Sequence, residues 1–151
     1  MSDANVALFK RWFEEVWNQK RRETIYELFA ADGVAYGVSD SGGDLRGPAE
    51  LLPFYERLIT AFPDIHLTVE DCFSIGDKVV GRYTATLTHT SDYMGLAASG
   101  KSATAKGISI VRVANGKFVE SWDCWDRLAL MHGIGGVQFT FSPPAARAEG
   151  A

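Results

Sequence analysis

The stretch Ser102–Trp125, SATAKGISIVRVANGKFVESWDCW, decides the fold of this chain. Apolar and polar residues alternate in two runs, about Ser102 to Val113 and Lys117 to Trp125, and Ala114-Asn115-Gly116 joins them. Alternation with a period of two is typical of half-buried strands. An Asn-Gly pair between two such runs indicates a hairpin. The stretch therefore predicts two long antiparallel strands.

The register of this hairpin depends on the length of its loop. With a three-residue loop that ends in a left-handed Gly116, Val113 pairs with Lys117. One face then carries small hydroxyls and a carboxylate, and its members are Gly107, Ser109, Val111, Val119, Ser121, Asp123 and Trp125. The other face is mainly apolar and includes Ile108, Ile110, Phe118, Trp122 and Cys124. A loop one residue shorter would shift this pairing, and periodicity alone does not decide which face meets the core.

Two further strands are predicted upstream. Residues 65–70 alternate between apolar and polar, and a long run rich in Thr and Val extends from Val79 to His89 after a turn at Gly76-Asp77. The segment Ser91 to Lys101 contains two glycines and is predicted to be a loop. The second half of the chain is thus a series of consecutive antiparallel strands.

The first part of the chain has the period of helices instead. Its first helix carries one broad aromatic face at i, i+3, i+4, i+7 and i+8, formed by Phe9, Trp12, Phe13, Val16 and Trp17. A second helix covers about Glu23 to Ala30, and a third opens at Gly47-Pro48. Pro53 predicts a late start or a kink in the third. Helices followed by strands indicate an α+β fold with the helices on one face of the sheet.

Length and composition place the chain in one globular class. A length of 151 residues fits a single domain, predicted at 1–142, with a flexible tail at 143–151. The hydrophobic fraction of 46% and charged fraction of 23% exclude a disordered chain. A net charge of −4 gives no reason to expect nucleic acid or an anionic membrane as partner. The N-terminus lacks a basic segment followed by an apolar one, so we expect a cytoplasmic protein.

Several short segments occur together in a familiar order. They are Phe13-Glu14-Glu15-Val16-Trp17-Asn18, Ala61-Phe62-Pro63-Asp64, Thr88-His89-Thr90, Gly95-Leu96, Gly107-Ile108-Ser109-Ile110, Asn115-Gly116-Lys117, Glu120-Ser121-Trp122-Asp123 and Trp125-Asp126. As an ordered series they resemble the SnoaL-like polyketide cyclase family of the nuclear-transport-factor-two-like superfamily. The similarity runs from about Asn5 to Gly136. The resemblance implies a cone-shaped barrel, in which N-terminal helices pack on a strongly curved, mainly antiparallel sheet.

The resemblance also implies a chemistry. Cyclases of this family close a ring of an aromatic polyketide by an intramolecular aldol condensation, without cofactor or metal. Their acid–base residue is an aspartate on the last long strand, and Asp123 matches it. Many relatives carry His or Asp at the position of Ser109, so here Asp123 has no second titratable group at that place. The superfamily also contains isomerases, dehydratases, epoxide hydrolases and proteins without known chemistry, so fold alone assigns no reaction.

Two residues are predicted to be catalytic, Asp123 and His89. Burial would raise the pKa of an aspartate from about 3.9 and make it a better acid–base group at neutral pH. The alternative for Asp123 is a carboxylate at the rim that holds a strand end. His89 could hydrogen-bond a substrate carbonyl or act as a second acid, and it could equally bond to backbone.

A further set is predicted to bind substrate: Trp17, Phe13, Tyr36, Ser109, Ser121, Trp125 and Met94. Met94 belongs to a loop that could cover the mouth of the cone, and Tyr36 could supply a phenol, although core or interface packing is the alternative for Tyr36. Asp126 is predicted to be structural, as a cap or an ion-pair partner. No metal site is expected, because His66, His89 and His132 are dispersed and no metal-binding spacing occurs.

Two functions follow. The first is a cofactor-independent acid–base enzyme on a small apolar carbonyl compound, with polyketide cyclisation ahead of isomerisation, hydration or hydrolysis. The alternative is a non-catalytic binding or assembly module with a vestigial pocket, which a filled cone or a solvent-facing Asp123 would favour. A homodimer through the sheet is also expected, because Ile108, Ile110, Phe118 and Trp122 would otherwise expose a large apolar surface.

Overall fold

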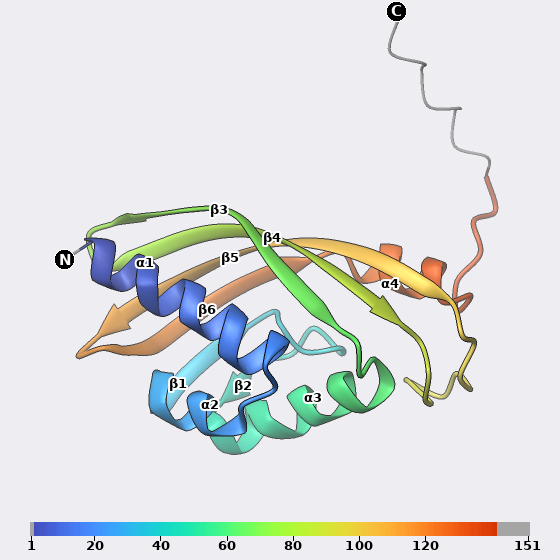
Figure 1. The fold of residues 1–151 in the computed structure, drawn as a ribbon, viewed down its shortest axis with the longest axis horizontal. Coiled ribbons are helices and arrows are strands. Elements are labelled where there is room, and N and C mark those ends of the chain that lie inside the picture. The colour runs from blue at the N-terminus through green and yellow to red at the C-terminus, as the bar shows by residue number, and fades with distance from the viewer. Residues whose placement is uncertain (1, 142–151) are drawn as a thin grey trace, which may run out of the picture.

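A curved sheet arches over four N-terminal helical segments in the computed structural model, which describes residues 2–141 (Figure 1). Within these residues the sheet has six strands in the order β2-β1-β6-β5-β4-β3, all antiparallel to their neighbours except the β1–β6 pair. The strands are β1 (Phe29–Tyr36), β2 (Leu45–Arg46), β3 (His66–Ile75), β4 (Lys78–Thr88), β5 (Ser102–Ala114) and β6 (Lys117–Trp125).

The helices lie mainly on the concave side of this sheet. They are α1 (Ser2–Arg11), the π-helix η1 (Trp12–Asn18), α2 (Arg22–Leu28), α3 (Gly47–Ala61) and α4 (Arg127–Gly133). The first two contact β3, and α3 contacts β1. The predicted α+β class, with helices on one face of a mainly antiparallel sheet, is confirmed.

The curved sheet has the predicted cone shape, but it does not close on itself into a barrel. Its edges are β2, only two residues long, and β3, and these do not pair with each other. Closure would need a continuous ladder of hydrogen bonds around the sheet. Helices fill the gap between the two edges instead and close the hydrophobic core (Figure 1).

The hairpin of β5 and β6 differs from its predicted register near the turn. Ala114 pairs with Lys117, and Asn115 and Gly116 both have positive φ, at 52° and 72°. This is the geometry of a two-residue turn, so the predicted three-residue loop is wrong.

A bulge then follows in β6. Val113 pairs with Phe118, but Arg112 pairs with Glu120. Because β6 has one extra residue here, its later side chains point to the side of the sheet predicted for them. Ser109 and Asp123 therefore lie opposite each other on the concave side. The bulge also turns Phe118 into the core, with 3% of its surface exposed, although the outer face was predicted for it.

Two elements were not predicted. Strand β1 begins at Phe29, inside the predicted second helix, and pairs in parallel with β6. Its sequence contains Gly33 and only one β-branched residue, so it has little strand signature. Helix α4 follows β6, and the carboxylate of Asp126 accepts a hydrogen bond from the backbone N–H of Ala129 at 2.9 Å. The predicted capping role of Asp126 is confirmed.

The aromatic face of the first helix continues into a π-helix. From Trp12 onward the backbone bonds span five residues, as between Gln19 N–H and the Glu14 carbonyl at 2.9 Å. Such segments are rare and are often found at functional sites. The third helix starts at Gly47 and continues through Pro53, so the predicted late start is wrong.

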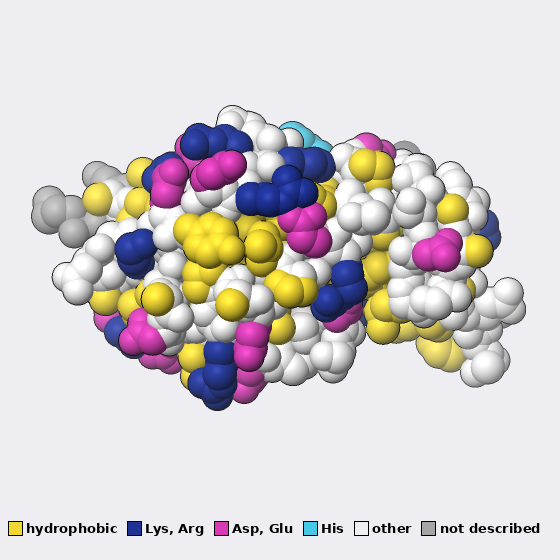
Figure 2. Space-filling model, turned by 90° about the horizontal axis from the view of Figure 1, so that it is seen from below, with side chains coloured by type: hydrophobic (Ala, Val, Ile, Leu, Met, Phe, Trp, Pro, Cys, Tyr) yellow, Lys and Arg dark blue, Asp and Glu magenta, His cyan; other side chains and the backbone are white. Residues whose placement is uncertain are grey.

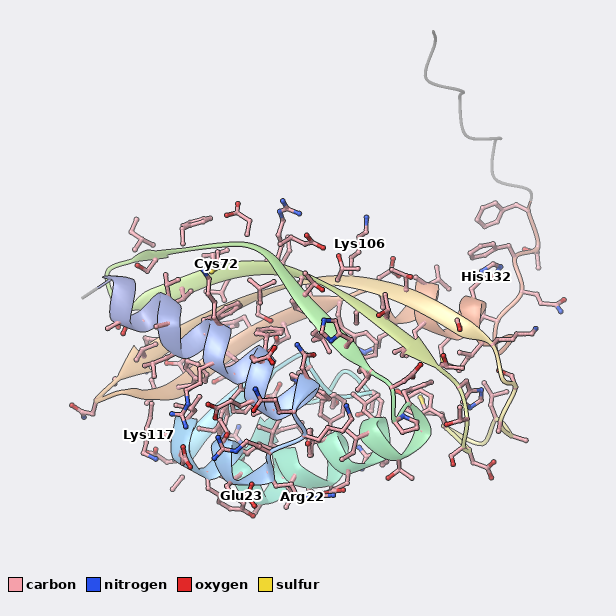
Figure 3. All side chains as sticks on the ribbon, viewed as in Figure 1. Arg22, Glu23, Cys72, Lys106, Lys117 and His132 are labelled. Atoms are coloured by element: carbon pink, nitrogen blue, oxygen red, sulfur yellow. The ribbon has the colours of Figure 1, made fainter. Side chains whose placement is uncertain are left out.

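The two broad faces of the molecule differ in character. On the helical side, charged side chains of both signs surround an apolar area (Figure 2). The helices α2 and α3 contribute to the ion pairs Arg22–Glu56 and Arg57–Asp40. On the outer side of the sheet, Lys106 points away from the helices, whereas Arg22 lies on the opposite side of the molecule (Figure 3). No helix within residues 2–141 is both long and apolar enough to cross a membrane. The predicted flexible tail, 143–151, lies outside the described residues.

A glycine in the centre of β4 lets the first helix approach the sheet. A Cβ atom on Gly81 would lie 2.3 Å from the ring of Phe9, which is fully buried. Real side chains do not approach so closely, so the position has room only for glycine.

We expect Gly81→Ala to destabilise the protein by about 1–3 kcal/mol, because the added methyl group overpacks the contact between α1 and β4. Urea denaturation monitored by tryptophan fluorescence measures this. The control is Gly43→Ala, whose nearest contact would be at 3.5 Å and which should change stability by less than about 0.5 kcal/mol. Equal stability of the two variants would contradict the packing described here.

Candidate functional site

A cavity lies between the concave face of the sheet and the helices. Its volume is about 100 Å³, several times the space that one water molecule needs. Aromatic and aliphatic side chains from all layers form most of its wall, among them Phe9, Trp12, Phe13, Trp17, Phe29, Leu51, Phe54, Leu58, Leu67, Leu87, Val111, Phe118 and Leu130. The wall also carries the three hydroxyls of Tyr83, Ser109 and Ser121 and the carboxylate of Asp123. A cavity of this kind suits a small, mainly apolar molecule with one polar group.

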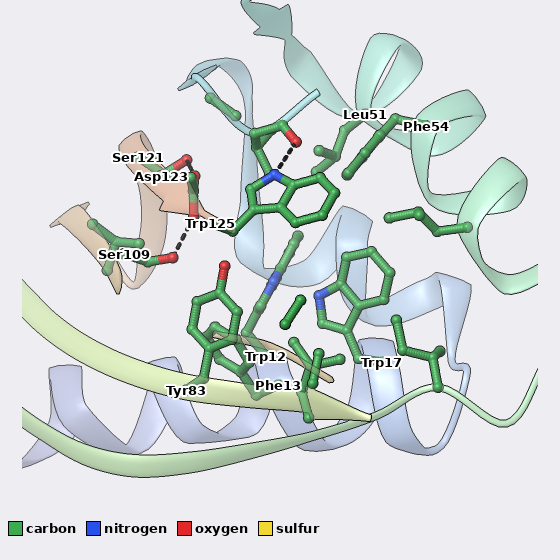
Figure 4. A pocket seen from close by; sticks show the side chains of 18 of the residues that line it. Trp12, Phe13, Trp17, Leu51, Phe54, Tyr83, Ser109, Ser121, Asp123 and Trp125 are labelled. Atoms are coloured by element: carbon green, nitrogen blue, oxygen red, sulfur yellow. Dashed lines mark hydrogen bonds between the residues drawn. The ribbon is translucent and has the colours of Figure 1, made fainter. Parts of the chain in front are cut away.

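The carboxylate of Asp123 is held by two hydroxyls. Asp123 on β6 pairs directly with Ser109 on β5, and the Ser109 hydroxyl donates to Oδ1. The hydroxyl of Ser121, two residues earlier on β6, donates to Oδ2 at 3.0 Å. Figure 4 shows the three side chains joined in this way at the wall of the cavity. We call this group the Asp123 cluster, namely Asp123, Ser109 and Ser121.

Burial dominates the electrostatics of the cluster. It raises the pKa of the Asp123 carboxyl above its ordinary value, because the charged form loses solvation. The two serine hydrogen bonds and the positive charge of Arg127 act in the opposite direction. The net rise brings the carboxyl closer to the range in which it can both take and return a proton at neutral pH.

A second group of contacts closes the wall beside Asp123. The indole N–H of Trp125 donates to the Val38 carbonyl at 2.9 Å, and the Arg127 guanidinium lies over the Trp125 ring, 4.8 Å from its centre. Arg127 also donates to the carbonyls of Gly37 and Ser39. These bonds hold the segment after β1 against the end of β6 and the start of α4.

The structure brings together six of the nine predicted site residues. Those at the cavity are Asp123, Phe13, Trp17, Ser109, Ser121 and Trp125. The other three, His89, Tyr36 and Met94, are not among the residues that line it.

His89 is completely buried in the junction between β4 and the following loop. Its Nδ1 accepts from the backbone N–H of Ser99 at 3.2 Å and is bonded to the Ser99 hydroxyl at 2.9 Å. Its Nε2 has no hydrogen-bond partner within residues 2–141. The ring packs against Phe62, and these contacts correspond to the alternative in which the histidine holds backbone.

Tyr36 and Met94 are displaced for two different reasons. Tyr36 lies on the outer side of the sheet, where its ring stacks on Trp122 with centres 5.9 Å apart. Met94 is at the tip of a tight turn closed by reciprocal backbone bonds between Tyr93 and Leu96, and 58% of its surface is exposed. Neither side chain can contact a molecule in the cavity as the chain stands.

Tyr83 is the polar residue of the cavity that the sequence analysis missed. It lies on β4, and its ring packs on Phe13 with centres 5.0 Å apart. The signal that could have found it is Gly107, its direct partner on β5. A glycine within a strand often marks the close approach of another group.

The donor groups of the cavity do not resemble a metal site. No group of three His, Cys, Asp or Glu side chains within the described residues is placed to hold a metal ion. Cys72 is half-buried, and Cys124 is exposed on the outer face.

Comparison with known proteins gives a family. The model of the SnoaL-like polyketide cyclase family matches residues 7–134, which include the whole cavity and the Asp123 cluster. The chain belongs to this family. The resemblance seen in the sequence is thereby confirmed. Comparison with the curated proteins returns no match.

Solved structures agree with this family. AclR from Streptomyces galilaeus, described provisionally as a hydroxylase, is 27% identical with a TM-score of 0.78, over 89% of this chain and 87% of its own. IdmH from Streptomyces antibioticus, described provisionally as a polyketide cyclase, is 28% identical with a TM-score of 0.75, over 87% and 98%. A SnoaL-like protein from Jannaschia sp. CCS1, 23% identical with a TM-score of 0.81 over 91% and 96%, shares the fold.

We expect the pKa of Asp123 to lie above about 3.9 and to rise further in Ser121→Ala, because that variant removes a hydrogen bond that favours the charged form. The carboxyl ¹³C chemical shift followed by NMR against pH measures both values. A wild-type pKa at or below the ordinary value would contradict the burial of this carboxylate.

Because the pKa of Asp123 is higher in the folded chain than in the unfolded chain, the stability of the protein depends on pH. As pH increases, the unfolded chain loses this proton first, so the contribution of Asp123 to stability is present below its unfolded pKa and is lost as pH passes its folded pKa. As pH rises from the unfolded to the folded pKa of Asp123, the stability of Asp123→Asn should therefore increase relative to that of the wild type.

Proposed function

We propose that this chain is a cofactor-independent acid–base enzyme that acts on a small, uncharged carbonyl compound, with Asp123 as its proton carrier. The observation that carries the proposal is a single carboxylate, with its pKa raised, on the wall of an otherwise apolar cavity. Ring closure by an intramolecular aldol reaction is the reaction we infer.

The chemistry needs one group that takes a proton and later returns it. The carboxylate of Asp123 removes a proton from the carbon beside a carbonyl, and the C–H electron pair forms an enolate. The enolate carbon then forms a C–C bond to a second carbonyl of the same molecule. The oxygen of that carbonyl takes the proton back from Asp123, so no proton is gained or lost overall.

The composition of the wall supports an uncharged substrate. None of the residues found to line the cavity is Lys, Arg or His, and Asp123 is the one acidic group among them. An anionic substrate would meet no cation there and would be repelled by the carboxylate. The rings of Phe13, Trp17 and Phe54 suit a flat or aromatic body.

The family supports the choice of reaction. IdmH is described as a cyclase and AclR as a hydroxylase, so membership alone does not select one chemistry. Asp123 matches the position of the acid–base aspartate in the cyclases, and this favours ring closure as the reaction. The alternative, a module with a vestigial pocket, fits less well, because the cavity is hollow and Asp123 lies on its wall.

Exchange of the α-protons of a model ketone tests the proton transfer without knowledge of the natural substrate. We expect the wild type to accelerate exchange of the α-protons of α-tetralone for deuterium in D₂O, followed by NMR. Asp123→Asn should abolish the acceleration, because an amide cannot accept the proton at neutral pH. Unchanged exchange in this variant, or no acceleration by the wild type, would refute the proposal.

We further propose that the enzyme is a homodimer that pairs through the outer face of the sheet. An apolar row crosses this face from β3 to β1, with each member paired to the next: Phe73, Val80, Ile110, Trp122 and Tyr36. In the adjacent row, Ile108 is 51% exposed. The helical side, by contrast, carries interspersed charges of both signs (Figure 2).

A second copy is the occupant that this face suits. The row is bordered by charges of both signs, Arg112 paired with Glu120 on one side and Arg82 on the other. When such a row lies across its own copy about a two-fold axis, apolar side chains meet apolar side chains.

We expect the wild type to sediment as a dimer at micromolar concentration and Trp122→Glu as a monomer, since the variant replaces an apolar ring of the row by a carboxylate that must lose its water when the two faces meet. The matched control is Tyr26→Glu on the helical side, where 54% of the tyrosine is exposed and the dimer should persist. A monomeric wild type would contradict the dimer.

A further inference from the structure

The phenol of Tyr83 occupies a place that β5 leaves open for it. Tyr83 on β4 pairs with Gly107 on β5, and a Cβ atom at Gly107 would lie only 2.4 Å from the phenolic oxygen. The side chain therefore extends across β5 over this glycine. Its ring is fixed on the other side by Phe13.

This position brings the hydroxyl beside the Asp123 cluster. The next residue of β5 that faces the cavity is Ser109, which donates to Asp123. Figure 4 shows the Tyr83 hydroxyl pointing toward this pair. Tyr83 and Asp123 thus present two polar groups to the same part of an apolar cavity.

The neighbouring donors are already engaged. Ser109 and Ser121 donate to the carboxylate, and the Trp125 indole N–H donates to the Val38 carbonyl. Burial and the charge of Asp123 raise the pKa of Tyr83 and outweigh the opposite effect of a hydrogen bond with Ser109, so the phenol keeps its proton at any physiological pH. The donors of the wall also include the indoles of Trp12 and Trp17, and among them the hydroxyl of Tyr83 points toward the Asp123 cluster, where it is suited to donate a hydrogen bond to a ligand (Figure 4).

We propose that Tyr83 is a catalytic residue whose O–H donates a hydrogen bond to the carbonyl oxygen of the substrate while Asp123 takes the proton from the adjacent carbon. This inference rests on the function proposed above.

Asp123 and Tyr83 together account for every bond and charge that changes in this step. The proton passes to the Asp123 carboxylate, and the electron pair of the broken C–H bond forms the C=C bond. The π electron pair of the carbonyl group moves onto its oxygen. Tyr83 keeps its own proton and stabilises the negative charge on that oxygen. A donor fixed in advance in an apolar site is effective because it need not reorganise as charge develops.

The decisive variant is Tyr83→Phe, tested by the α-proton exchange of α-tetralone in D₂O. We expect exchange to slow by about 10²–10³-fold, the usual cost of removing one such donor. The matched control is Tyr93→Phe, because Tyr93 is also a buried tyrosine with its pKa raised to about 12, but it packs on Phe62 away from the cavity. Its exchange rate should equal that of the wild type.

Two results separate this inference from the proposed function. Exchange that needs Asp123 but is as fast in Tyr83→Phe as in the wild type would overturn the role of Tyr83 and leave the proposed function intact. No exchange in the wild type would overturn both.

Infrared spectroscopy tests the hydrogen bond directly and does not depend on turnover. The C=O stretch of bound α-tetralone should lie at lower frequency in the wild type than in an alkane solvent, and should return toward the alkane value in Tyr83→Phe. Gly107→Ala should have the same effect while keeping the phenol, since its methyl group takes the space of the hydroxyl. A wild-type stretch equal to that in the alkane would overturn the inference whether or not the variants fold.

Discussion

The hydrogen bonds from Ser109 and Ser121 to Asp123 are the interaction on which the site depends. They satisfy both oxygens of a carboxylate that would otherwise be costly to keep among apolar side chains. Burial and hydrogen bonding act on its pKa in opposite directions, and burial prevails. The site therefore combines a stable place for the carboxyl with the proton affinity that acid–base chemistry requires.

The rest of the fold supplies the dry surroundings of this cluster. An open, curved sheet provides one wall, and the π-helix η1 contributes Phe13 and Trp17 to the other. Two glycines in the sheet admit large rings from the concave side, Gly81 for Phe9 and Gly107 for Tyr83. The space that these glycines leave is thus filled by aromatic groups, and only the polar edge of Tyr83 reaches the cluster.

The sequence was informative where local pattern dictates structure. Alternation placed Ser109 and Asp123 on one face of the hairpin. Helical spacing placed Phe13 and Trp17 on the aromatic face of the first helix, and in the structure these two faces line the same cavity. The sequence was less informative where long-range packing decides: β1 contains only one β-branched residue, and its pairing with β6 holds it in the sheet. Tyr83 was missed because alternation alone does not show that a glycine on the next strand makes room for its hydroxyl. His89 and Met94 were misplaced because loop conformation depends on contacts such as that with Ser99.

The central claim is that the cavity receives an uncharged carbonyl compound with its oxygen beside the Asp123 cluster. A crystal structure of the protein grown with α-tetralone tests this most directly. We expect the ketone inside the cavity, its rings against the aromatic wall and its oxygen within hydrogen-bond distance of the Tyr83 hydroxyl. A ketone bound elsewhere, or a cavity closed by its own side chains, would contradict it.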